Sequence, residues 1–177
     1  QLEIERDRWQ GVPIYIRAGK KVQQAASEVS IVFKRPPHKV FNQFLGEEFS
    51  SPNVLTLRIS GGEAILLQFL VKQPGHEMRL QPAAMQFCYR DIQGKLMEPY
   101  AKLLLDAFRG DQTLFALPEE VEAQWRFIDP ILAGWNEGIV EPETYRADSL
   151  GPASVGNLIQ FDQRQWFLSD PALCSIL

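Results

Sequence analysis

Three cations surround a glycine near the beginning of the chain, where a predicted strand ends. The segment Val12–Lys21 runs from an apolar, alternating stretch into Gly19, with Arg17, Lys20 and Lys21 close to it. A glycine lets the backbone pass close to a ligand. Lys20 can reach a phosphate as a compact point charge, and Arg17 can hold a second oxyanion or orient the turn. The pattern is compatible with an anion site, although on spacing alone a solvated basic strand end is the more common explanation.

Other reactive side chains show no catalytic pattern. His38 and His76 each lie beside prolines without an evident partner, so we expect both in surface loops. The chain carries no dinucleotide-binding glycine fingerprint and no Walker lysine. Cys88 and Cys174 have neither zinc-ligand nor redox-motif spacing, and we expect buried or idle thiols.

From the composition we expect one soluble, intracellular domain. The chain has 177 residues, 45% of them hydrophobic, and a net charge of −4 without a basic tract, so we expect no nucleic-acid partner. The longest apolar stretch, Ala64–Val71, is far shorter than the roughly 20 residues of a membrane helix, so we expect no membrane association. Because Gln1 is not an initiator methionine, we expect the sequence to start inside a longer gene product.

Hydrophobic spacing predicts an α+β fold, with strands in the first two-thirds and helices after them. The helix that starts at Pro118 has an apolar stripe, expected to be core, that runs through a kink at Pro130. We expect one domain over residues 1–177, with an irregular tail over residues 137–177 anchored by Tyr145, Trp166 and Phe167. The predicted strands cover about residues 28–34, 53–60, 63–72 and 85–89, and the predicted helices about residues 99–108 and 118–135.

The hairpin around Gly61-Gly62 allows two registers. A two-residue loop places Arg58 opposite Ile65 and mixes polar with apolar side chains on both faces. One extra loop residue, or a bulge, collects Leu55 and Leu57 on one face with Ile65. We predict the second register. The opposite face is then mixed in character and is expected to meet another domain or subunit.

Five segments resemble, in order, those of the glucose-6-phosphate dehydrogenase family. The matched motifs are R-W-x-G-V-P-x-x-x-R-x-G-K, the bacterial F-K-R-P-P-H, K-x-P-G, L-L-L-D-A-x-x-G-D-x-T-L-F, and a helical segment that continues into D-P-I-L. They correspond to Arg8–Lys20, Phe33–His38, Lys72–Gly75, Leu103–Phe115, and Glu120–Arg126 with Asp129–Leu132. The resemblance covers about residues 9–135; in the tail, Gly151-Pro152-Ala153 and Trp166 carry it.

This resemblance implies the C-terminal domain of such an enzyme, a large, mostly antiparallel sheet with helices packed on one face. The parent oxidises glucose 6-phosphate to 6-phosphogluconolactone with NADP, in the cytoplasm, as a homodimer or homotetramer. NADP and the catalytic pair would belong to a missing N-terminal domain. Lys20 would bind the sugar phosphate, with Arg17 beside it.

The chain departs from the family pattern at two sites, the one for the substrate phosphate and the one for a structural NADP. The family usually has a second substrate-binding cation where this chain has Ala25, which leaves two alternatives: weak phosphate affinity from this side, or substitution by Lys21. Some members hold a structural NADP on the sheet. Arg17, Arg58 and Trp166 match its contacts, but several others appear here as Ala26, Ser30, Leu66, Gln68 and Leu150, so no structural NADP is expected.

The sequence therefore leads to one main hypothesis and two alternatives. The main hypothesis is a substrate-binding and oligomerisation domain that is inactive without its N-terminal part. The first alternative is a stand-alone binding or scaffold module, with Ala25 marking a decayed site. The second, an enzyme in its own right, is disfavoured because no catalytic constellation is visible.

Overall fold

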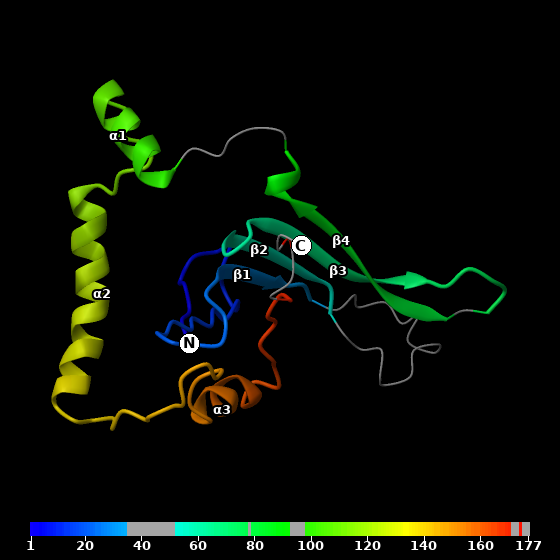
Figure 1. Cartoon of the computed structure of the whole chain (residues 1–177). Helices are drawn as coiled ribbons and strands as arrows, with labels where there is room; N and C mark the ends of the chain where they lie inside the picture. The colour runs from blue at the N-terminus through cyan, green and yellow to red at the C-terminus, as the bar shows by residue number, and fades with distance from the viewer. Residues whose placement is uncertain (35–51, 78, 93–97, 171–173, 175–177) are drawn as a thin grey trace. The chain divides into compact units, whose positions relative to one another are not determined.

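The computed structural model describes residues 1–34, 52–77, 79–92, 98–170 and 174. Their contacts form two compact units, residues 1–93 with 145–177, and residues 94–144. The first unit holds a sheet and helix α3 (Ser154–Gln160), which lies within the segment expected to be irregular. The second unit holds α1 (Pro99–Arg109) and α2 (Pro118–Asn136) (Figure 1). The α+β prediction is confirmed, whereas His38 lies outside the described residues.

Four antiparallel strands form the sheet in chain order (Figure 1). They are β1 (Ser27–Val32), β2 (Val54–Ser60), β3 (Ala64–Lys72) and β4 (Leu80–Cys88), followed by a short 3-10 turn, η2 (Tyr89–Asp91). β3 pairs with β4 along its whole length but with β2 only as far as Gln68, so the distal part of β3 and β4 is a two-stranded ribbon. The strand predicted to lead into Gly19 is reduced to one bridge between Leu2 and Ile14.

The β2–β3 hairpin has the register predicted from its apolar residues. Leu57 pairs with Ile65 and Leu55 with Leu67, which brings these side chains to one face. The turn accommodates the extra residue because Gly61 and Gly62 adopt φ values of 81° and 94°, which glycine reaches without the steric cost of a Cβ.

We expect Gly61→Ala to lower the free energy of unfolding by about 1–3 kcal/mol. Its Cβ would lie 2.7 Å from the Ala25 carbonyl oxygen at a φ of +81°, so the backbone would have to move. Gly11→Ala is the matched control, because Gly11 has a φ of +71° but no described atom within 4 Å of its built Cβ. Urea denaturation measures both variants, and equal losses would show that the close approach to Ala25 contributes nothing.

The sheet buries its mixed face. Its buried side chains alternate along β2, β3 and the end of β4, and they are Val54, Thr56, Arg58, Ala64, Leu66 and Cys88. The chain's own C-terminal segment, which begins at residue 145, contacts this face through residues 167–170. The Ser30 hydroxyl donates to the Phe167 carbonyl (3.2 Å), and Ser169 is 6% exposed. We had expected another domain or subunit here. The segment fits because its main chain and Ser169 supply the polar partners that this face requires.

The opposite, apolar face of the sheet is half-buried at its centre and exposed toward its ends and edges. Ile31, Ile59 and Phe87 are 44%, 63% and 45% accessible to solvent. Exposed apolar side chains that share a face are typical of an interaction site.

The second unit consists of two helices with the predicted ends. Gly110 terminates α1 with a φ of 70°, and α2 begins at Pro118 and continues through Pro130. In the connecting turn, the Thr113 hydroxyl donates to the Asp111 carboxylate (2.6 Å). This bond, together with one from the Thr113 N–H, lowers the pKa of Asp111 below its usual value.

Within the second unit, the apolar stripe of α2 is exposed. Its residues, Val121, Trp125, Ile128, Leu132 and Trp135, are between 37% and 60% exposed. Helical spacing shows that these side chains share a face but not what covers that face. Among helices in the part of the chain that the structure describes, none has both the length and the apolarity needed to cross a membrane.

Candidate functional site

The Lys20 turn, which we define as residues 19–23, carries the predicted phosphate-binding lysine. Lys20 is exposed, and its carbonyl accepts a 2.6 Å hydrogen bond from the Tyr145 hydroxyl. A Cβ on Gly19 would lie 3.0 Å from Val22 Cγ1 and 3.4 Å from the Tyr145 hydroxyl oxygen. A Cβ at this position would crowd Val22, so the glycine allows the tight packing of the turn beside Tyr145.

The second half of the Lys20 turn pairs with residues 148–149 of the C-terminal segment. The Asp148 N–H donates to the Lys21 carbonyl (2.8 Å), and Val22 forms a parallel bridge with Ser149. Lys21 and Asp148 have φ values of 52° and 59°. Because a side chain in the left-handed region costs roughly 1–2 kcal/mol, these contacts are needed to maintain the shape of the turn.

Arg17, the second predicted site residue, is held by its side chain. Its guanidinium lies over the Trp166 ring, 5.0 Å from the centroid, and it donates to the Leu150 carbonyl (3.4 Å). The Trp166 indole N–H in turn donates to the Val155 carbonyl (3.4 Å). The structure thus holds Arg17 through its guanidinium and Lys20 through its main chain, which leaves the Lys20 ammonium exposed for a ligand.

Tyr15 strengthens the same attachment. In an extended segment, residues two apart lie on one face, so Tyr15 and Arg17 both reach Trp166. The Tyr15 and Trp166 rings pack edge to face, with their centroids 6.3 Å apart. The Tyr15 hydroxyl donates to the Asp162 carboxylate. Principally because of this bond, and secondarily because of desolvation, the pKa of Tyr15 is raised above its usual value. The hydroxyl therefore stays protonated, and can donate, to a higher pH than that of an ordinary tyrosine.

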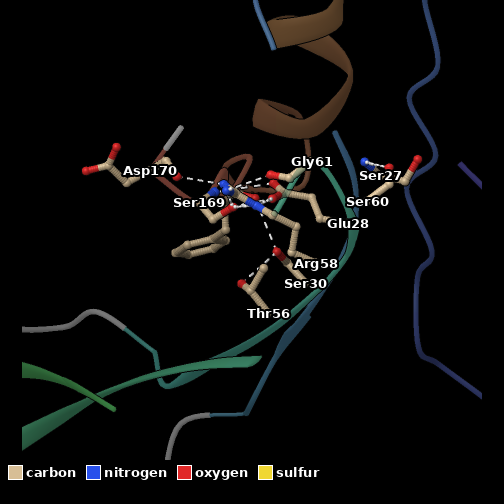
Figure 2. Close-up of polar contacts among 10 residues, drawn as sticks. Ser27, Glu28, Ser30, Thr56, Arg58, Ser60, Gly61, Ser169 and Asp170 are labelled. Carbon is tan, nitrogen blue, oxygen red and sulfur yellow. Dashed lines mark hydrogen bonds and ion pairs between the residues drawn. The ribbon is translucent and has the colours of Figure 1, made fainter. Parts of the chain in front are cut away.

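A second polar cluster lies on the buried face of the sheet, around Arg58 (Figure 2). The Arg58 side chain is 0% exposed, and its Nε lies 3.7 Å from the Glu28 carboxylate. The guanidinium donates to the Ser169 hydroxyl oxygen (3.0 Å from Nε), to the Asp170 carbonyl (2.7 Å) and to the Gly61 carbonyl (3.4 Å). The Ser169 hydroxyl donates to Glu28 and so lies between the two charges. The C-terminal segment thus completes a buried ion pair.

A disulfide joins Cys88 at the end of β4 to Cys174. The Cα atoms are 5.7 Å apart, and the residues are 5% and 8% exposed. Both cysteines are buried, as one form of the expectation had it, but they are not free thiols, because the fold brings together two cysteines that are 86 residues apart.

The remaining candidates contribute no further site. His76 is exposed in the turn between β3 and β4. In the described ranges, no three His, Cys, Asp or Glu side chains gather in a way that could hold a metal ion.

Sequence reasoning found the cations but missed most of what holds them. Tyr145 and Trp166 were expected to be anchors because isolated aromatics in a polar tail indicate attachment points. Asp162, Ser149 and Ser169 gave no such signal, because short polar residues are common in loops. Their roles depend on pairing with residues more than 100 positions away.

Comparison with known proteins agrees with this architecture. A family model described as "Glucose-6-phosphate dehydrogenase, C-terminal domain" matches residues 1–167. The glucose-6-phosphate 1-dehydrogenases of Mycolicibacterium smegmatis and Aggregatibacter actinomycetemcomitans are 39% and 40% identical to this chain over 94% of its length. The alignments cover 33% of each relative, so the chain spans about a third of their length.

Solved structures show the same relationship. Glucose-6-phosphate 1-dehydrogenase from Mycobacterium avium matches with a TM-score of 0.73 at 28% identity, over 94% of this chain and 33% of that one. A structure described as "Glucose-6-phosphate dehydrogenase in complex with its substrate glucose-6-phosphate" matches with a TM-score of 0.80 at 28% identity, over 95% and 34% of the two chains. With the match over residues 1–167, these similarities confirm the resemblance seen in the motifs: the chain belongs to the glucose-6-phosphate dehydrogenase C-terminal domain family.

Proposed function

We propose that this chain is the C-terminal part of a glucose-6-phosphate dehydrogenase and that Lys20 binds the phosphate of glucose 6-phosphate. The parent enzyme would oxidise the sugar phosphate to 6-phosphogluconolactone, a step of the oxidative pentose phosphate pathway. The observation that carries the proposal is the exposed Lys20 side chain at the end of the R-x-G-K segment, on a turn whose main chain is held by residues 145–149. An exposed ammonium on a fixed turn suits a phosphate, which needs a charge-assisted donor but no covalent chemistry from it.

Arg17 has a supporting role in this proposal. Its guanidinium lies over Trp166 and donates to Leu150, so of its two predicted roles the contacts favour orienting the turn. Ala25, at the family's second cation position, offers no charge to the substrate. Lys21 is exposed next to Lys20 and is the cation available to compensate.

NADP would be the hydride acceptor, bound mainly by an N-terminal domain of the parent. A second NADP on this sheet does not fit the donor set. Arg58 is bonded to Ser169 and to two main-chain carbonyls, with the Glu28 carboxylate 3.7 Å from its Nε. A phosphate there would have to displace these partners and would face the negative charge of Glu28. We therefore propose that the parent holds no structural NADP.

The partners in this proposal are the parent's N-terminal domain and further copies of the chain, as a homodimer or homotetramer. The exposed apolar side chains of the sheet, such as Ile59 and Phe87, support the presence of a packing partner. We propose a cytoplasmic location. A disulfide such as Cys88–Cys174 is uncommon in a reducing cytosol, so its oxidation state in cells is a direct check on that location.

Lys20→Ala in the full-length enzyme should raise KM for glucose 6-phosphate about 10- to 100-fold, the equivalent of one charge-assisted contact. The value of kcat should change much less, because the phosphate is remote from the carbon that is oxidised. Steady-state NADPH formation measures both constants.

Lys34→Ala is the control, since Lys34 is also exposed but follows β1 and lies outside the Lys20 turn. An unchanged KM in Lys20→Ala would remove Lys20 from the phosphate site. A full-length chain that does not reduce NADP with glucose 6-phosphate would overturn the proposed function itself.

A further inference from the structure

The segment of residues 145–149, here named the clamp, contacts the Lys20 turn through the backbone of the turn. The Tyr145 hydroxyl donates to the carbonyl of Lys20 itself. Farther along, the Gln23 N–H donates to the Ser149 carbonyl (3.0 Å). These contacts determine where the Cα of Lys20 lies while leaving its ammonium exposed. A residue held by its main chain and open at its side-chain end is suited to present that end to a ligand.

We propose that Tyr145 is a positioning residue for phosphate binding by Lys20. This inference rests on the proposed function, because it needs Lys20 to bind the sugar phosphate. A lysine side chain has four rotatable bonds and a non-directional charge. Its affinity for a phosphate therefore depends strongly on how well the root of the side chain is fixed before binding. The Tyr145 hydroxyl oxygen is 2.6 Å from the carbonyl oxygen of Lys20, whose carbonyl carbon is bonded directly to the Cα that carries the side chain.

Two further observations indicate that the turn does not hold this shape by itself. Lys21, next to Lys20, has a φ of 52° and therefore occupies a region that a lysine rarely adopts. Gly19, on the other side, packs tightly within the turn, since a Cβ there would lie 3.0 Å from Cγ1 of Val22, and Val22 is itself bridged to Ser149 of the clamp. Both neighbours of Lys20 therefore lie in a turn whose packing involves the clamp. Substrate affinity would in this way depend on a segment 125 residues farther along the chain.

The test is Tyr145→Phe in the full-length enzyme, which removes the hydroxyl and keeps the ring. We expect KM for glucose 6-phosphate and the inhibition constant of inorganic phosphate to rise together, by about 3- to 10-fold, the equivalent of one neutral hydrogen bond. The value of kcat and KM for NADP should change less than about twofold, because the effect is confined to phosphate binding. A merely structural defect would alter all four constants or none.

Tyr89→Phe is the matched control, since it makes the same chemical change in η2, where the ring packs edge to face on Phe87. Gly19→Ala is a second variant that disturbs the turn itself, and it should raise the same two constants because its Cβ would lie 3.0 Å from Cγ1 of Val22, which is bridged to Ser149 of the clamp. Unchanged phosphate inhibition in Tyr145→Phe would overturn the proposal.

The double variant Tyr145→Phe/Lys20→Ala separates this inference from the proposed function. If Tyr145 acts through Lys20, the double variant has the KM of Lys20→Ala alone. If Lys20→Ala raises KM and Tyr145→Phe does not, the positioning role is wrong and the proposed phosphate site stands. If Lys20→Ala itself has no effect, the assignment of the phosphate site is wrong as well.

Discussion

Arg58→Met is expected to lower the free energy of unfolding by about 3–5 kcal/mol, the typical cost of removing one partner from a buried ion pair. The Arg58 side chain is 0% exposed and that of Glu28 is 12% exposed, so water can do little to solvate the remaining carboxylate. Ser169 would lose two donors at the same time. Urea denaturation measures the loss, and amide exchange in β1 and β2 localises it.

The matched control is Arg79→Met, the same substitution in an exposed ion pair. The Nε of Arg79 lies 2.7 Å from the Glu77 carboxylate, but the two side chains are 70% and 71% exposed. The expected loss in the free energy of unfolding is therefore below about 1 kcal/mol. Adding Glu28→Gln to Arg58→Met should recover part of the stability, because it removes the uncompensated buried charge. Equal losses in Arg58→Met and Arg79→Met would show that burial of the pair contributes nothing.

Loss of the Cys88–Cys174 disulfide should lower the free energy of unfolding by about 2–4 kcal/mol. The bond closes a loop over a separation of 86 residues, so its removal increases the conformational entropy of the unfolded chain. It also frees the end of the C-terminal segment, which supplies Ser169 to the ion pair of Arg58. Urea denaturation with and without dithiothreitol measures the effect.

The double variant Cys88→Ala/Cys174→Ala tests whether dithiothreitol acts on this bond. Wild-type protein should become less stable when the dithiol reduces the disulfide to two thiols. The double variant should have low stability that does not respond to dithiothreitol. If the wild type is equally stable in both conditions, the crosslink does not stabilise the fold.

The predictable parts of the fold depend on residues close in sequence. The register of the β2–β3 hairpin follows from the alternation of Leu55 and Leu57 with Ile65, because a one-residue slip would move every side chain to the other face. The end of α1 follows from Gly110, which adopts the left-handed conformation that glycine favours. In both cases, the residues that determine the local structure lie within about ten positions of one another.

The candidate site was only half predictable for the same reason. The R-x-G-K segment identified Lys20 and Arg17 as cations at the end of an extended segment. That Arg17 lies over Trp166, and that Tyr145 holds the Lys20 carbonyl, depends on contacts across more than 120 residues. No local pattern encodes such pairings, because the polar groups involved are satisfied equally well by water in an isolated segment.

By itself, the sequence determined the family, the α+β class and the hairpin register. Tertiary structure alone decided which face of the sheet is buried, that Cys88 and Cys174 join, and that the C-terminal segment holds the Lys20 turn. The physical reason is the difference between local and distant interactions. Periodicity and backbone preference act within a few residues, whereas Arg58 and Glu28 can be buried only after a distant serine reaches them.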